Sequence, residues 1–259
     1  MLKRVFTVGL LAGLTAGLAT AALQHVTTVP LILEAERYEA SLPAGPALAD
    51  AGILTAVATH GPETAAPGHT HAAGEGHAAG EGHSHDAAAW SPADGLERTL
   101  STSVATVVSG IGFSLLLLAV LLLAGERVTP RIALAYAVGG FAATGLATGL
   151  GLAPELPGSF AAPLQDRQLW WIGTAVATAA GLYLVVKAPH RLALPAGVVL
   201  LALPHLIGAP HPDGYGSTVP AEIAAHFAAT SLVVHGVFWA IVGLAVGAFW
   251  QRGESRAAG

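Results

Sequence analysis

Residues 103–124 of the chain read SVATVVSGIGFSLLLLAVLLLA and contain no charged side chain. A helix needs roughly 20 mostly apolar residues to cross the hydrocarbon core of a bilayer. This stretch is therefore predicted to be a membrane-spanning helix. The rest of the chain agrees, because 53% of its residues are hydrophobic and only 10% are charged, whereas about a quarter are charged in soluble domains.

The same criterion finds six spans, at residues 5–23, 103–124, 132–152, 169–187, 192–208 and 223–250. We predict an all-α integral membrane protein, a bundle of six transmembrane helices, with five as the alternative because the fifth stretch is short and contains Pro195 and Pro204. The expected domains are a first span (1–24), an external loop with a short helix and a histidine-rich linker (25–90), and a five-span membrane domain (91–259). The first span resembles a cleavable signal peptide, but its length favours retention.

Charge placement predicts the orientation, because short loops rich in Lys and Arg stay cytoplasmic. With the N-terminus inside, eight of the eleven basic residues lie inside and fourteen of the sixteen acidic residues lie outside. We therefore favour six spans in a bacterial inner membrane, with both termini on the cytoplasmic side. The acidic external face should then attract cations. Arg98, Trp170 and Trp171 are interpreted as anchors at the membrane surface.

A polar stretch from residue 60 to residue 85 contains half of the histidines of the chain, among Gly, Ala, Pro and acidic residues. Such a composition cannot build a core, so we predict a disordered external loop. Neutral imidazole binds divalent transition metals, and the loop is expected to capture one. The candidate ligands are His69, His71, His77, His83 and His85. The alternative is a passive polar linker.

A short helix is predicted at residues 31–39, with Pro30 suited to its first turn. Glu34 within it has two interpretations. It is either a solvated partner of Arg37 or a carboxylate at the outer mouth of a cation path.

A candidate metal site is also predicted within the membrane. Three prolines lie in residues 203–212 around His205, so the backbone there cannot be a regular helix throughout, as at many transporter sites. Glu222 and His226 lie four residues apart on one face of the last span. They would approach His205 if the fifth and sixth spans pack as an antiparallel pair. His235 lies about 180° around the helix from His226, so His235→Ala is expected to be mild.

Five stretches resemble, in order along nearly the whole chain, the CbtA family of probable cobalt transporter subunits. They are VPLILEAE (29–36), DGLERT (94–99), PELPG (154–158), RQLWWIGT (167–174) and LPHLIGAP (203–210). The matching residues are Glu34, Glu36, Arg98, Glu155, Arg167, Trp170, Trp171, His205 and Glu222. The resemblance implies membrane transport of cobalt linked to cobalamin supply, with a small one-span, histidine-bearing partner subunit, CbtB. Five spans are usual in that family, whereas charge placement here favours six.

Several classes of function lack their motifs. No Gly-x-x-x-x-Gly-Lys stretch is present, so no bound nucleotide is expected, and neither His-Glu-x-x-His, Gly-x-Ser-x-Gly nor a cysteine occurs. We therefore predict a transporter component and not an enzyme. A membrane-bound metal-dependent enzyme and a metal sensor or buffer are the alternatives. Co²⁺ is the expected substrate, with Ni²⁺ or Zn²⁺ as alternatives. The expected partners are the lipid bilayer and CbtB, and a homo-oligomer is a further possibility. No nucleic acid is expected to bind.

Overall fold

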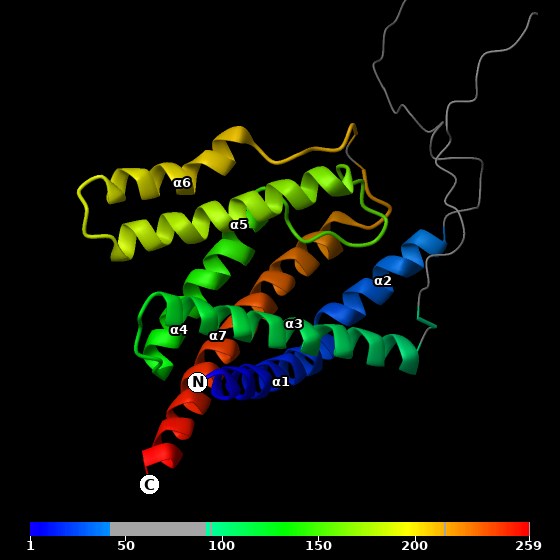
Figure 1. Ribbon diagram of the computed structural model, residues 1–259. Coiled ribbons are helices and arrows are strands. Elements are labelled where there is room, and N and C mark those ends of the chain that lie inside the picture. The colour runs from blue at the N-terminus through cyan, green and yellow to red at the C-terminus, as the bar shows by residue number, and fades with distance from the viewer. Residues whose placement is uncertain (42–91, 94, 215, 259) are drawn as a thin grey trace, which may run out of the picture.

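The computed structural model describes residues 1–41, 92–93, 95–214 and 216–258. The predicted histidine-rich loop lies outside these residues. Within them the chain is helical and forms no strand, only one isolated bridge between Ser159 and Ser217. The predicted all-α class is confirmed (Figure 1).

Four helices are long and apolar enough to cross a membrane: α1 (Leu2–Val26), α3 (Leu96–Leu123), α5 (Leu164–Lys187) and α7 (Ala221–Ala258). The two remaining predicted spans are shorter. One is α4 (Pro130–Phe141), which continues directly into the π-helix η1 (Ala142–Ala147), and the other is α6 (Ala193–Ile207). The predicted short helix is α2 (Thr28–Ala40), which follows α1 after a break at Thr27.

Helices α1 and α3 are in close backbone contact. Glycines repeat every fourth residue on one face of α1, and a Cβ atom added to Gly13 would lie 2.3 Å from the Cα of Ile111. One added to Gly17 would lie 2.5 Å from the Cα of Val107. Small residues let helix backbones approach each other within a membrane. The close contact of α1 with α3 therefore requires glycine at these positions of α1.

Helix α7 packs on α1 and α4 and forms the centre of the bundle. Close packing again involves glycine, since a Cβ atom at Gly247 would lie 2.4 Å from the Cα of Pro130. The largest fully buried apolar side chains are Leu118 and Leu121 from α3 and Val242 and Val246 from α7. These four residues form part of one apolar cluster, which we call the central plug.

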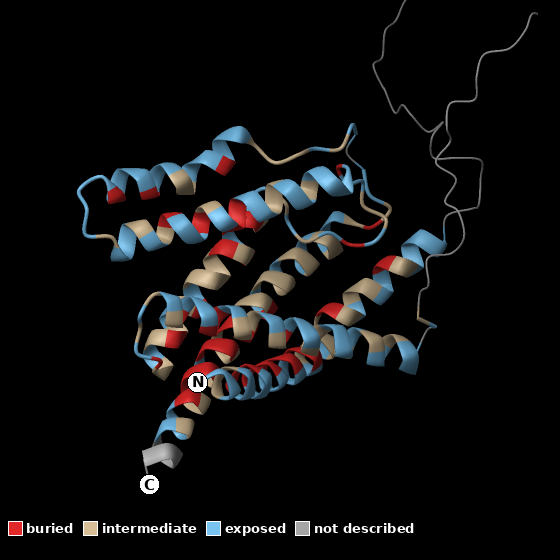
Figure 2. Cartoon of the chain, in the orientation of Figure 1, coloured by how far each residue is buried: buried red, intermediate tan, exposed pale blue. Residues whose placement is uncertain are grey.

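Helices α5 and α6 form a peripheral hairpin. They meet at Gly181 and Gly197, where an added Cβ atom would lie within 2.9 Å of the facing backbone oxygen. Helix α6 packs on α5 and makes no helix contact with α7 in the described chain. Figure 2 shows most of this hairpin exposed, as expected of surfaces that face lipid.

The ends of the bundle differ. We call the end at which α2 ends and α3 begins the loop side, and the opposite end, where both chain termini lie, the termini side (Figure 1). Two carboxylates lie near the termini side and both are paired. Glu254 lies 3.2 Å from Arg4, and Glu126 accepts hydrogen bonds from Lys187 and Tyr136.

Candidate functional site

A cavity of about 700 Å³ lies between α1, α2, α3, η1, α5 and α7. Its lining comes from the last residues of α1, the first half of α3, the end of the α4–η1 segment and the first half of α7. All of these lie in the loop-side half of the bundle. The cavity is therefore a vestibule on the loop side.

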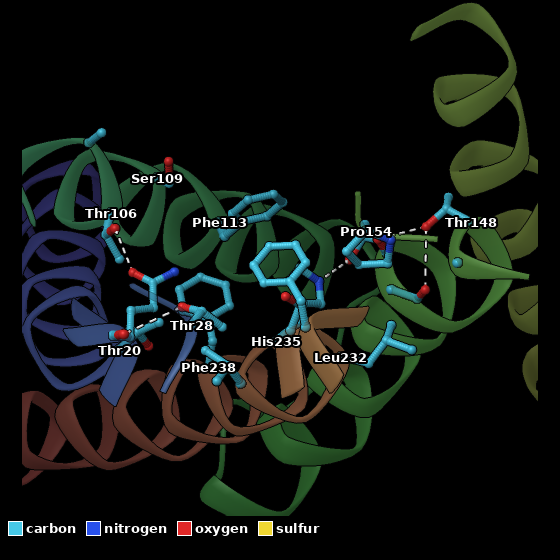
Figure 3. Close-up of a pocket in the computed structure, with 18 of the residues that line it drawn as sticks. Thr20, Thr28, Thr106, Ser109, Phe113, Thr148, Pro154, Leu232, His235 and Phe238 are labelled. Atoms are coloured by element: carbon cyan, nitrogen blue, oxygen red, sulfur yellow. Dashed lines mark hydrogen bonds between the residues drawn. The ribbon is translucent and has the colours of Figure 1, made fainter. Parts of the chain in front are cut away.

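The polar lining side chains recur at helical spacing. Four helical segments each present hydroxyl, amide or imidazole groups three or four residues apart: Thr20 and Gln24; Thr102, Thr106 and Ser109; Thr144 and Thr148; Ser231 and His235. Thr28, the first residue of α2, adds a further hydroxyl to the lining. Side chains three or four apart lie on one helix face. In Figure 3, Thr20 and Thr106 lie at one end of the view, His235 lies near its middle and Thr148 lies at the other end.

Some of these groups are held by neighbouring helices. The Thr106 hydroxyl donates to Gln24 Oε1 at 3.0 Å, which links α3 to α1. One turn away, His25 Nε2 and Ser103 Oγ are 3.2 Å apart. Thr20 differs, because it is only 4% exposed and its Oγ1 has no hydrogen-bond partner within the part of the chain that the structure describes. A buried hydroxyl without a partner is unfavourable by about 1–3 kcal/mol.

Among the described residues that line the cavity, His235 is the one ionisable residue. Its Nε2 lies 3.0 Å from Thr144 Oγ1 and 3.1 Å from Trp239 Nε1. The ring packs between Phe141 and Phe238, with centroid distances of 5.9 and 6.1 Å. Aromatic packing and two polar neighbours therefore fix the orientation of the imidazole.

The cavity accommodates a hydrated cation better than a naked one. No Asp or Glu of the described residues lines it, and an ion without a counter-charge is strongly disfavoured away from water. A water molecule takes about 30 Å³ in the liquid, so the cavity has room for about 20 of them. Hydroxyl and amide oxygens can accept hydrogen bonds from the water molecules of such an ion.

The vestibule is closed toward the termini side. Beyond its deepest lining residues lies the central plug of Leu118, Leu121, Val242 and Val246, each fully buried. A second cavity of about 440 Å³ lies on the far side of the plug, lined in part by Glu126, Thr129 and Glu254. Apolar side chains thus separate two polar spaces, and a charged solute cannot cross the plug in this arrangement.

The structure shows that Glu34 is exposed on α2, with no ion pair to Arg37 in the described chain. The neighbouring Glu36 is the paired carboxylate. It accepts a hydrogen bond of 2.8 Å from Arg98 Nη1 and a second bond from Nη2. The hydrogen bond from the Arg98 guanidinium lowers the pKa of Glu36 below its ordinary value. Arg98 therefore links α2 to α3, and its interpretation as a simple surface anchor was incomplete.

The structure does not bring His205, Glu222 and His226 together. His205 is exposed on α6, while Glu222 and His226 are exposed on α7, and these two helices do not touch. The expected antiparallel packing of the fifth and sixth spans is wrong, because α6 pairs with α5 through glycine contacts. No group of three or more His, Asp or Glu side chains in the described residues could hold a metal ion.

The two tryptophans are more than surface anchors. Trp170 packs edge-on against His205, with ring centroids 6.2 Å apart, and donates a 3.3 Å hydrogen bond to the carbonyl of Pro204. It therefore helps to hold α6 on α5. Trp171 lines the vestibule.

Sequence reasoning missed the vestibule and underrated His235. Single hydroxyl residues in glycine-rich, apolar spans indicate little by themselves, because they are common in membrane helices. The signal was the repetition of polar residues at spacings of three or four on four separate segments. The loop histidines from His69 to His85 lie outside the described residues, so their predicted role stays a prediction.

The comparison with known protein families agrees with this architecture of apolar helices around a polar vestibule. The model of the family described as "Probable cobalt transporter subunit (CbtA)" matches residues 2–251. No curated protein and no solved structure matches the chain. Since the match covers nearly the whole chain, this multi-pass membrane protein belongs to the CbtA family of probable cobalt transporter subunits.

Proposed function

We propose that the protein takes up Co²⁺ across the inner membrane, and that the vestibule is the outward-facing part of the path. The observation that carries this proposal is the polar vestibule, which the central plug closes on one side only. Family membership supports the choice of cobalt. Ni²⁺ and Zn²⁺ remain the alternative substrates, because oxygen and nitrogen ligands bind them as well.

The proposed topology has six crossings, with α4–η1 as the third and α6 as the fifth. Both termini are then cytoplasmic and the loop side is external. Basic residues support this orientation, because Arg4, Arg127, Lys187 and Arg252 all belong to the termini side. The vestibule then faces the compartment from which metal is taken up.

We assign the histidine-rich loop to capture of scarce metal, and the exposed Glu34, Glu222 and His226 to attraction of cations toward the vestibule. An acidic external surface raises the local concentration of cations. His205 is left as a weaker candidate ligand because Trp170 and α5 hold it away from the vestibule. Energy comes from a partner or an ion gradient, because the chain has no nucleotide motif.

The family consists of subunits, which implies a complex. We propose a small one-span subunit with histidines, CbtB, as the partner; a homo-oligomer is the second candidate assembly. A membrane-bound metal-dependent enzyme or a metal sensor is the alternative function. Neither needs polar spaces on both sides of an apolar plug, whereas transport does.

The test is uptake of radioactive cobalt by cells that lack the chromosomal gene, with and without the full-length chain. We expect uptake with the wild type and its loss with His235→Ala, whereas His205→Ala should retain more than half. Membrane expression is measured in parallel. A wild-type chain that is expressed with its partner but adds no uptake would contradict transport and favour a sensor.

The loop is tested separately by deletion of residues 61–86. Uptake should fall at scarce metal and recover at plentiful metal, because a capture loop changes local concentration and not the path. Loss of uptake at every concentration would instead make the loop part of the path.

A further inference from the structure

The three side chains His235, Thr144 and Trp239 form one hydrogen-bonded cluster at the inner end of the vestibule. Trp239 Nε1 lies 3.0 Å from Thr144 Oγ1 and 3.1 Å from His235 Nε2, while Thr144 Oγ1 and His235 Nε2 are 3.0 Å apart. Each atom thus lies within hydrogen-bond distance of the other two. The positions of the protons decide what the imidazole offers to the vestibule.

The proton of Thr144 has its own acceptor, because Oγ1 donates to the carbonyl of Gly140 at 2.8 Å. A hydroxyl oxygen can accept two hydrogen bonds besides. Thr144 can therefore accept from Trp239 Nε1–H and from His235 Nε2–H at the same time. In that arrangement every polar hydrogen of the cluster has an acceptor, and the lone pair of the imidazole is on Nδ1.

The other tautomer fits the same positions. His235 Nε2 then accepts the indole N–H of Trp239, and the proton moves to Nδ1. This form needs an acceptor such as water at Nδ1. The occupant of the vestibule therefore selects the tautomer. The indole N–H of Trp239 can donate to Thr144 Oγ1 at 3.0 Å in one form and to His235 Nε2 at 3.1 Å in the other.

His235 Nδ1 is available to an occupant of the vestibule. It has no hydrogen-bond partner in the described chain, and it is not among the buried atoms cut off from solvent. Thr20 lines the same vestibule but differs from His235, because its Oγ1 is buried and has no hydrogen-bond partner in the described chain.

We propose that His235 Nδ1 is the protein ligand that enters the first coordination shell of a hydrated divalent transition-metal ion in the vestibule, with Thr144 as the positioning residue that accepts the Nε2 proton of the metal-binding tautomer. The other ligands are water molecules, which can donate hydrogen bonds to the hydroxyl groups that line the vestibule. Histidine ligands commonly donate their second N–H to an oxygen acceptor, which fixes the ring. The identity of the ion as cobalt rests on the proposed function.

The chemistry of the ligand predicts which ions are chosen. Imidazole suits Co²⁺, Ni²⁺ and Zn²⁺, whereas Mg²⁺ and Ca²⁺ prefer carboxylate, carbonyl and water oxygens. A vestibule with no carboxylate and one imidazole should hold Co²⁺ and leave hard cations unbound. This selectivity does not require the loop histidines.

The experiment uses the full-length chain in detergent with the six histidines of residues 60–85 changed to Gln, so that only the bundle binds metal. Calorimetry with Co²⁺ compares this background with His235→Gln, Thr144→Val and Thr144→Ser. His235→Gln should abolish the binding, and Thr144→Val should weaken it about 10–100-fold, the usual effect of losing a partner of a ligating histidine. Thr144→Ser keeps the hydroxyl and should restore affinity. His190→Gln, at an exposed histidine on the termini side, is the control.

Nitrogen-15 NMR of labelled histidines then reports the tautomer, with diamagnetic Zn²⁺ as the probe. The His235 signal, assigned by its loss in His235→Gln, should show Nδ1 bound to metal and Nε2 protonated. Unchanged Co²⁺ affinity in His235→Gln, or a Zn²⁺-loaded protein with Nδ1 still protonated, would overturn the site. Wild-type uptake with no binding at His235 would reject this inference alone, whereas binding at His235 without uptake would reject the proposed transport alone.

Discussion

At the scale of single residues, position within the bundle decides what a polar side chain does. Thr20 and Thr174 are both buried threonines with an unpartnered Oγ1, and they are 4% and 1% exposed. Thr20 lines the vestibule, whereas Thr174 does not. Comparing the two residues therefore separates the effect of a buried hydroxyl on protein stability from its effect on transport.

The first prediction uses that pair. Thr20→Val and Thr174→Val each replace an unpartnered hydroxyl by a methyl group of similar size, and each should raise the free energy of unfolding by about 1 kcal/mol. Only Thr20→Val should lower cobalt uptake, because Thr20 lines the vestibule and Thr174 does not. Thermal unfolding in detergent and uptake in cells are measured on both. Normal uptake by Thr20→Val would exclude this hydroxyl from the path.

At the scale of elements, two different kinds of interaction hold neighbouring helices together. Glycines bring α1 against α3, with a Cβ atom at Gly13 only 2.3 Å from the Ile111 backbone. An ion pair between Glu36 and Arg98 holds α2 on α3 at the mouth of the vestibule. The first kind is a matter of shape, and the second depends on charge.

The second prediction tests the shape of the α1–α3 contact. Gly13→Leu should destabilise the protein by about 3 kcal/mol, because the new side chain has no space and the facing atoms are backbone. Gly112→Leu on α3 is the matched control, since a Cβ atom there meets nothing within 4 Å. Folded yield and thermal unfolding in detergent provide the comparison. Equal stability of the two variants would refute the glycine contact.

The third prediction concerns the pH dependence of the α2–α3 link. Because the hydrogen bond from Arg98 lowers the pKa of Glu36 from 4.5, the link is fully present above pH 4.5. It is lost as the pH falls below that value through the lowered pKa. The chain has no cysteine, so spin labels at Glu39→Cys and Leu100→Cys report the separation of α2 and α3.

The expected result is a narrow distance distribution at pH 7 that broadens below pH 4.5. In the Glu36→Gln background the distribution should be broad at both pH values, because an amide cannot pair with Arg98 in the same way. A narrow distribution in Glu36→Gln at pH 7 would show that other contacts, such as the packing of Ala35 with Leu156 and Val219, hold α2 alone.

At the scale of the whole molecule, two polar spaces lie on opposite sides of an apolar plug. The proposed transport requires that the plug open toward the termini side while the vestibule closes, as in alternating access. Glu126 and Glu254 line the second cavity, and each is paired with a basic residue from another part of the chain, Lys187 and Arg4.

The fourth prediction tests the proposed six crossings through α6. In the chain without cysteine, Asp213→Cys should react with a membrane-impermeant thiol reagent in intact cells. Arg191→Cys, at the other end of α6, should react only after permeabilisation. Reaction at both positions in intact cells would mean that the α5–α6 hairpin does not cross as proposed.

The membrane class, the helical content and the separation of basic from acidic ends could be predicted from the sequence, because they depend on local composition. Residues 103–124 are apolar enough to require a bilayer wherever they are placed. The helix at Thr28–Ala40 could be predicted for the same reason, because its helix-forming residues and the proline of its first turn lie close together in the sequence.

The site was decided by tertiary structure, because the face that a helix turns inward depends on distant partners. His205 and His235 look alike in sequence, yet α6 pairs with α5 through Gly181 and Gly197 and keeps His205 outside. Glycine contacts of α7 with α4 turn His235 toward Thr144 and the vestibule. The sequence by itself determined that polar groups recur within the spans; only the packing of backbones made through glycines determined which of them share one space.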